Sequence, residues 1–214
     1  MITVWLIRHG ESISNADLPT TDPAESVLTE KGQQQAAYIP LAFAHKPDLI
    51  VVSPYVRARQ TAVPTITHFS PISVEEWPVH EFTYLAPQRY HNTTGSDREP
   101  YARAYWERND PQHKDDGRGE SFAELLRRVR QTSARLQAHP AEFIAIFSHG
   151  MFSRALIWSL LTGIEEATPE TMRRYGRFLE SVWMPNAAIC KIQFSEHHDP
   201  LLSGFITAHL SPKG

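Results

Sequence analysis

The sequence predicts an α/β fold, a three-layer α/β/α sandwich around a mostly parallel central sheet. Short apolar runs alternate along the 214-residue chain with longer segments of helical spacing, and this alternation favours a parallel sheet. Hydrophobic residues make up 41% of the chain, which suffices for a sizeable core. No internal repeat, low-complexity tract or heptad pattern interrupts the chain. We therefore expect a single domain over residues 1–214.

The predicted strands are apolar runs that end at turn residues. The first, Ile2–Ile7, is continuously apolar and leads into Arg8-His9-Gly10. The second, Asp48–Val52, is rich in branched residues and is closed by Ser53-Pro54. The remaining expected strands are Ile72–Glu76, Phe143–Phe147, Ala187–Phe194 and Leu201–Ala208.

Capping residues mark the predicted helix starts. Thr29-Glu30-Lys31-Gly32 begins a helix with Thr29 as its N-cap. The body of this helix should run from about Gln33 to Ala44, and Pro40 should kink or shorten it. Ser53 followed by Pro54 suits the cap and first turn of a second helix. Further helices are expected at about Arg98–Arg108, Ser121–Ala138, Phe152–Leu161 and Thr168–Leu179, the last with Thr168 as its cap and Pro169 at its first position.

Residues 77–119 differ from the rest in composition, being rich in Pro, Tyr, His, Arg and Asp. They hold too few aliphatic side chains for a core of their own. We interpret this stretch as an insertion or cap over one end of the main core rather than as a separate domain.

Composition excludes several classes of partner. The net charge of −3 argues against a nucleic-acid or anionic-membrane binder. The single cysteine, Cys190, cannot form an internal disulfide, and a reducing compartment is the simplest fit. The chain shows no secretory signal, and its longest apolar stretches are too short to span a bilayer. We therefore expect a cytoplasmic protein without nucleic-acid or membrane partners.

Polar clusters follow four of the predicted strands: Arg8-His9-Gly10, the Ser53–Arg57 turn, the segment around Glu81, and Ser148-His149-Gly150. Ligands bind at the carboxyl ends of strands in such sheets. Arginine offers a fork of donors suited to phosphate oxygens, and histidine can act as a nucleophile or carry a proton. Taken alone, Arg8-His9-Gly10 is equally consistent with a plain strand cap. The convergence of four clusters favours an active site.

Five ordered motifs resemble those of the histidine phosphatase superfamily, also called phosphoglycerate mutase-like. They are Leu6–Ser12 followed by Asn15, Leu28–Ala36, Ser53–Ala62, Gly119–Phe122 with Arg128-Val129, and Ser148–Gly150. The resemblance covers most of the chain, and five motifs in register are far more specific than one. It implies the phosphoglycerate mutase-like fold.

The resemblance also implies roles for individual residues. His9 would be the nucleophile and would form a phosphohistidine, with Glu81 as the proton donor to the leaving oxygen. The phosphate would be bound by Arg8, Asn15, Arg57 and His149. For the acid, Glu75 and Glu76 are nearby alternatives, and Glu11 or Glu120 could play supporting roles.

No metal or cofactor is expected, because two arginines and a histidine can supply the positive charge that a phosphoryl group needs. His80-Glu81 is not a zinc motif, since position 84 is Tyr84 where a second histidine would be required.

The resemblance does not fix the substrate. In phosphoglycerate mutases of the family, the acid is followed by Arg-His-Tyr-Gly, whereas Glu81 is followed by Phe82-Thr83-Tyr84-Leu85. We therefore favour the phosphatase branch and expect a phosphomonoesterase that acts on a phosphorylated small molecule. Mutase-type phosphoryl transfer and a catalytically silent phosphate-binding module are the alternatives. A homodimer is possible at the level of the family.

The insertion should line the substrate mouth. It supplies cations and aromatic rings, and our hypothesis is that some of them contact the part of the substrate that does not react. The set comprises Arg89, Arg98, Arg103, Arg108, Lys114, Arg118, Tyr84, Tyr90, Tyr101, Tyr105 and Trp106.

Overall fold

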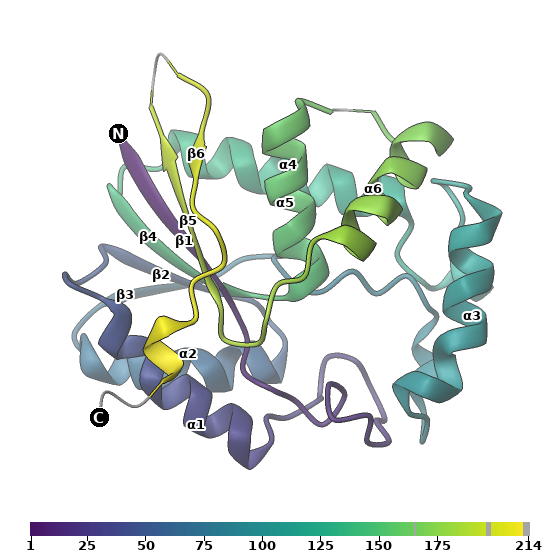
Figure 1. Ribbon diagram of the computed structural model, residues 1–214, viewed down its shortest axis with the longest axis horizontal. Coiled ribbons are helices and arrows are strands. Elements are labelled where there is room, and N and C mark those ends of the chain that lie inside the picture. The colour runs from purple at the N-terminus through teal and green to yellow at the C-terminus, as the bar shows by residue number, and fades with distance from the viewer. Residues whose placement is uncertain (165, 196–197, 212–214) are drawn as a thin grey trace.

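The computed structural model describes residues 1–164, 166–195 and 198–211. Its centre is a six-stranded sheet in the order β3-β2-β4-β1-β5-β6 (Figure 1). Neighbouring pairs among β1 to β4 are parallel, whereas β5 and β6 are antiparallel to their neighbours. The strands are β1 Ile2–Arg8, β2 Leu49–Val52, β3 Ser73–Glu76, β4 Phe143–Ser148, β5 Ile189–Phe194 and β6 Leu201–Leu202. The predicted mostly parallel sheet is confirmed.

Helices cover both faces of this sheet. Figure 1 shows α1 and α2 on one face and α4, α5 and α6 on the other, with α3 at the side. The helices are α1 Glu30–Tyr38, α2 Val56–His68, α3 Gly95–Arg108, α4 Phe122–Ala138, α5 Gly150–Thr162 and α6 Pro169–Ser181. This is the predicted three-layer sandwich.

Alternation along β1 divides the core into two. Val4 and Leu6 pack in the cluster that includes side chains of α4 and α5. Trp5 and Ile7 belong to the cluster that includes α2. Because successive side chains of a strand point to opposite faces, one apolar run fills both layers. The strand thereby leaves its carboxyl end, and His9 after it, at the edge of a packed core.

Most predicted helix starts are confirmed. The Thr29 side chain accepts a hydrogen bond from the Gly32 amide, and Ser121 and Thr168 cap α4 and α6 in the same way. The predicted shortening of the first helix by Pro40 is also confirmed. Helix α1 ends at Tyr38, and a 3-10 turn, Ile39–Ala42, follows it.

The predicted Ser53 cap is wrong. Helix α2 begins at Val56, with Tyr55 as its N-cap and no side-chain capping bond. The Ser53 hydroxyl instead pairs with His149 Nε2 at 2.8 Å and accepts a 3.3 Å hydrogen bond from the Tyr55 amide. The serine therefore ties the turn to the second histidine motif rather than to its own helix.

The predicted strand Leu201–Ala208 is shorter than expected. Only Leu201–Leu202 forms a strand, and an isolated bridge joins Ile189 to Ile206. Between Leu202 and Ile206 the pairing with β5 shifts by one residue. Here the Ser203 hydroxyl accepts a 2.8 Å hydrogen bond from the Lys191 amide. Such a bulge ends the regular ladder.

The stretch 77–119 consists of α3, two 3-10 turns (Pro87–Tyr90 and Asp115–Gly117) and loops. Trp77, Phe82 and Tyr105 are buried in the same cluster as the sheet. Near α3, Asp17 accepts hydrogen bonds from the amide and hydroxyl of Ser96, which fastens the helix to the loop after β1. We propose that the chain forms one domain with an insertion at about residues 77–119.

In the part of the chain that the structure describes, no helix is both long enough and apolar enough to cross a membrane.

Candidate active site

Two histidines meet at the carboxyl ends of β1 and β4. The parallel register pairs Arg8 with Ser148, so His9 and His149 follow neighbouring strands directly. The His9 amide donates a 3.0 Å hydrogen bond to the Ser148 carbonyl, and the two imidazole centres lie 5.0 Å apart. Both side chains are buried, His9 being 2% exposed. The sheet register therefore brings together two residues that lie far apart in the sequence.

Hydrogen bonds fix the tautomer of His9. Nδ1 lies 2.7 Å from the Gly10 carbonyl oxygen, which can only accept, so Nδ1 carries the proton. Nε2 is left with its lone pair and accepts a 3.0 Å hydrogen bond from Arg57 Nε. Burial, and then the charges of Arg57 and Arg8, hold the pKa of His9 well below its usual range. The result is a neutral imidazole with a lone pair at Nε2.

Two glycines bring α1 against the His9 loop. A Cβ on Gly10 would lie 2.5 Å from the Gly32 carbonyl oxygen, and one on Gly32 would lie 2.0 Å from the Glu11 carbonyl oxygen. No larger side chain fits between these backbones. The Gly10 amide also donates to Thr61 Oγ1 at 3.1 Å. The close approach explains why both glycines occur in the motifs.

Two buried arginines flank His9 without an ion pair. Arg57 Nη1 donates to the Pro23 carbonyl at 2.5 Å, and Arg8 Nη1 donates to the Met184 carbonyl. In the described part of the chain, neither has a carboxylate within 4.0 Å. Burial lowers the pKa of Arg8 to about 10 and also lowers that of Arg57. Because a buried charge is costly unless paired, this arrangement suits an incoming anion.

The two ring nitrogens of His149 differ in their contacts. Its Nε2 pairs with Ser53 Oγ at 2.8 Å, whereas its Nδ1 is buried without a hydrogen-bond partner. Burial, and then the nearby Arg57, hold the pKa of His149 well below its usual range. A buried polar atom without a partner is uncommon, so Nδ1 is a ready contact for a ligand.

Glu81 is bound at the N-terminus of α5. Its Oε1 accepts hydrogen bonds from the amides of Met151 and Phe152, each at 3.0 Å, and from its own neighbour Phe82 at 3.0 Å. A helix N-terminus attracts a carboxylate in this way. The charge of Glu81 raises the pKa of Arg8 and of Arg57, and partly offsets the effect of burial on both guanidinium groups.

The alternative acids are engaged elsewhere. Glu75 forms an ion pair with Arg135 at 2.7 Å, and Glu76 forms one with Arg59 at 2.5 Å. Both pairs are exposed, at β3 on the edge of the sheet. The supporting acids also have partners, because Glu11 pairs with Lys31 and Glu120 with Arg128.

Asn15 is linked to the His9 motif through Asn186, in the loop before β5. Asn15 Oδ1 accepts hydrogen bonds from Ser12 and, at 3.0 Å, from Asn186 Nδ2. Asn186 also donates to the His9 carbonyl at 3.2 Å. Nothing in the sequence around Asn186 marks this role, because it depends on how the loop before β5 crosses the His9 motif.

Several insertion cations have internal partners. Arg89 pairs with Asp115, Arg103 pairs with Glu99, and Arg98 Nη1 donates to Thr93 and Thr20. Other insertion residues, Thr83, Pro87, Lys114, Arg118 and Gly119, line a cleft of about 650 Å³. Tyr55 also lines this cleft, and its ring centre lies 5.2 Å from that of His149. The insertion therefore borders the neighbourhood of the two histidines.

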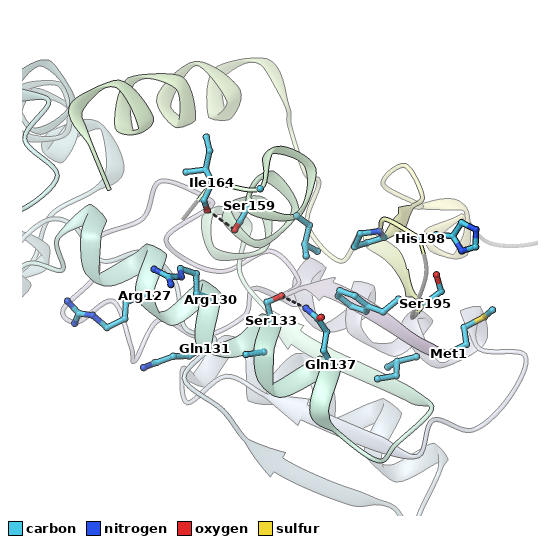
Figure 2. Close-up of a pocket in the computed structure, with 16 residues that line it drawn as sticks. Met1, Arg127, Arg130, Gln131, Ser133, Gln137, Ser159, Ile164, Ser195 and His198 are labelled. Atoms are coloured by element: carbon cyan, nitrogen blue, oxygen red, sulfur yellow. Dashed lines mark hydrogen bonds between the residues drawn. The ribbon is translucent and has the colours of Figure 1, made fainter. Parts of the chain in front are cut away.

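A larger groove, of about 1020 Å³, lies at the opposite, amino ends of the parallel strands. Figure 2 shows Arg127, Arg130 and Gln137 of α4 along it, with Ser195 and His198 across from them. Its lining contains none of the candidate active-site residues at the carboxyl ends of β1 and β4. Among the described residues, no cluster of three or more His, Cys, Asp or Glu side chains could hold a metal ion.

Comparison with known proteins places the chain in a family. Residues 4–203 match the model of the histidine phosphatase superfamily, branch 1. The chain belongs to this superfamily.

Among its curated relatives, an uncharacterized phosphatase, PhoE, of Bacillus subtilis (strain 168) is 28% identical over 99% of this chain and 98% of its own length. An adenosylcobalamin/alpha-ribazole phosphatase of Salmonella typhimurium is 32% identical over 74% of this chain and 79% of its own length. A solved structure of phosphoserine phosphatase from Entamoeba histolytica superposes with a TM-score of 0.74 and 24% identity, over 99% of this chain and 100% of that one. The predicted superfamily, fold and phosphatase class are confirmed.

Proposed function

We propose that this histidine phosphatase is a phosphomonoesterase that hydrolyses a phosphorylated small molecule through a covalent phosphohistidine at His9. The observation that carries the proposal is the state of His9, a buried neutral imidazole whose Nε2 lone pair faces Arg57. The phosphatase names of two relatives support the same class of reaction.

Binding of the phosphate would use the donors that lack a counter-ion. In the free enzyme Arg57 Nε occupies the lone pair of His9, so an entering phosphate would draw this guanidinium onto its own oxygens and free Nε2. Arg8 would contribute from the other side. If the Ser53 hydroxyl donates to His149 Nε2, the proton of that imidazole sits on Nδ1, from which it can bind a third oxygen. Asn15 would add a neutral donor at the rim.

The first chemical step would be attack of His9 Nε2 on phosphorus. The bond from phosphorus to the leaving oxygen breaks, and the oxygen takes a proton from Glu81 as the alcohol departs. The Gly10 carbonyl stabilises the positive charge that develops on the imidazole, because it already accepts the Nδ1 proton. The cations would neutralise charge on the equatorial oxygens throughout.

The second step would return His9 to its free state. A water molecule attacks the phosphohistidine and gives its proton to the Glu81 carboxylate, and the bond between Nε2 and phosphorus breaks. Inorganic phosphate leaves, and Arg57 resumes its contact with Nε2. Glu81 would thus give a proton to the leaving oxygen in the first step and take one from water in the second. Its position at the start of α5, 3.0 Å from two amides, would hold the carboxyl group in place during both steps.

A phosphate-release panel tests this function. Sugar phosphates, nucleotides, phosphorylated acids and phosphopeptides are incubated with the wild type and with His9→Ala. We expect the wild type to release phosphate from a small-molecule ester and His9→Ala to release none above background. Interconversion of phosphoglycerates without phosphate release would favour a mutase, and binding without turnover would favour a silent module. Either result would overturn the proposal.

The homodimer and the cytoplasmic location stay predictions. The mass in solution, measured by light scattering, and fractionation of cells that express the chain test them.

A further inference from the structure

An exposed tryptophan stands beside one of the buried arginines. Trp183 is 68% exposed, although the residue after it, Met184, is completely buried. The Cζ atom of Arg8 lies 5.2 Å from the centre of the indole ring. In the described part of the chain no other aromatic ring contacts Trp183. One face of the indole therefore meets a guanidinium, and much of the remaining surface is open to solvent.

The backbone that carries this indole is fixed to the His9 motif. We call Val182–Asn186 the Trp183 loop. Arg8 donates to its Met184 carbonyl, Asn186 donates to the His9 carbonyl at 3.2 Å, and Arg154 donates to the Val182 carbonyl at 2.8 Å. The residue that follows, Ala187, donates its amide to the His9 carbonyl at 3.1 Å. The loop is held at both ends, so Trp183 has a defined place at the rim of the site.

Other exposed apolar side chains lack such a setting. Leu201 is 67% exposed but lies on β6, the edge strand beyond β5. Scattered exposed apolar residues are normal on protein surfaces. Trp183 differs because it contacts a cation that has no carboxylate partner and that would bind the phosphate.

We propose that Trp183 is a stacking platform that selects phosphomonoesters whose leaving group carries a planar aromatic or heteroaromatic ring. The ring of the leaving group packs on the part of the indole surface that Arg8 leaves open. Aromatic rings gain energy from such stacking beyond the burial of their area, whereas a saturated ring of the same size gains only the burial. This inference rests on the proposed function, since it assigns the alcohol part of the substrate.

A matched pair of substrates tests the platform. Benzyl phosphate and cyclohexylmethyl phosphate have rings of similar size and alcohols of similar acidity, so they differ in planarity. We expect the ratio of their kcat/KM values, benzyl over cyclohexylmethyl, to fall by about 5-fold in Trp183→Ala and to be largely kept in Trp183→Phe. Leu201→Ala, which removes an equally exposed side chain, should leave the ratio unchanged.

An equal loss for both substrates in Trp183→Ala would show that Trp183 only positions Arg8, and it would overturn the inference. An unchanged ratio would overturn it too. Calorimetry of the same two esters binding to His9→Ala separates failure of the stacking inference from failure of the proposed function. If the wild type hydrolyses neither these esters nor any substrate of the phosphate-release panel, the phosphatase proposal fails, and tighter binding of benzyl phosphate that depends on Trp183 would still support the platform. Equal binding of the two esters would contradict it.

Discussion

The two ends of the parallel strands present opposite surfaces. At the carboxyl ends, His9, Arg8, Arg57 and His149 are buried, and the arginines have no ion-pair partner among the described residues. At the amino ends, the groove of about 1020 Å³ shown in Figure 2 is roomier, and its α4 side chains, such as Gln137, are exposed. Burial of a charge costs free energy that folding has to offset, whereas an open groove costs little. The candidate site is therefore distinguished by buried cations that lack an ion-pair partner, and not by the volume of a groove.

The largest effect on activity is expected from replacing His9, the proposed nucleophile. We expect His9→Ala to lower kcat by about 10⁴-fold or more, because covalent catalysis has no substitute at this position. Gln137→Ala, in the opposite groove, should leave kcat and KM unchanged. Both are measured by phosphate release under the same conditions. A His9→Ala enzyme that keeps a substantial part of the wild-type rate would remove His9 from the chemistry.

Loss of a buried cation should come next. Arg57→Met is expected to reduce kcat/KM by roughly 10²-fold to 10³-fold, as for other single donors to a developing charge. Arg57→Lys should restore little, because an ammonium cannot reproduce the fork of donors. Arg130→Met, on the groove of Figure 2 and outside the cleft near His149, is the control and should leave kcat/KM unchanged. Similar losses for the two Met variants would mean that overall charge, and not this site, governs the rate.

Glu81→Gln tests the proposed role of Glu81 as proton donor. The amide keeps the shape of the side chain but cannot deliver a proton, so kcat for an alkyl phosphate should fall by about 10²-fold. The loss should be much smaller for 4-nitrophenyl phosphate, whose leaving group needs no proton. Glu76→Gln, which removes an exposed carboxylate at the sheet edge, serves as control. Equal losses for the two substrates would assign Glu81 a purely structural role at the start of α5.

Acid should destabilise the protein through its buried histidines. Burial holds the pKa of His9 and of His149 well below its usual range, whereas both titrate near pH 6.5 in the unfolded chain. Below that pH the unfolded state binds more protons, so stability is lost as the pH falls. Each histidine contributes about 1.4 kcal/mol to the loss between pH 7.5 and 5.5. Urea unfolding at the two pH values should show a loss smaller by this amount in His149→Asn. An identical loss in this variant would mean that His149 is charged in the folded protein.

The smallest effect is expected at Ser53. Ser53→Ala removes the 2.8 Å contact with His149 Nε2 but no group that would touch the phosphate. The cost is that of one hydrogen bond, about 1 kcal/mol, and should appear as a fall of about 5-fold in kcat/KM. Ser53→Thr keeps the hydroxyl and should recover activity if space allows. A loss as large as that of Arg57→Met would place Ser53 in direct contact with the substrate.

The sequence predicted the elements better than the connections between them. Thr29 and Thr168 cap helices as expected, since capping depends on residues within one turn. Ser53 has the same local signal, yet its hydroxyl binds His149, which lies 96 residues away in the sequence. A local pattern cannot anticipate a competing partner from another strand. The bulge near Ser203 was missed for the same reason.

The same limit applies to the site. The motifs indicated His9, Arg57 and His149 because these residues stand at the ends of strands that a parallel sheet brings together. Asn186 and Trp183 belong to a loop whose path over the His9 motif is set by Arg8 and by Met184, which is buried. No residue near them in the sequence carries a signal for that path. Sequence reasoning therefore found the residues proposed for the chemistry and missed those that surround it.

The central claim, a covalent intermediate on His9, is tested most directly by rapid quenching with a substrate labelled in its phosphoryl group. Wild-type enzyme mixed with labelled benzyl phosphate and quenched in alkali should carry label on the peptide that contains His9. That label should be stable to alkali, lost in acid, and absent from His9→Ala. Release of phosphate by the wild type with no label at any time point, or label on a different residue, would contradict the account.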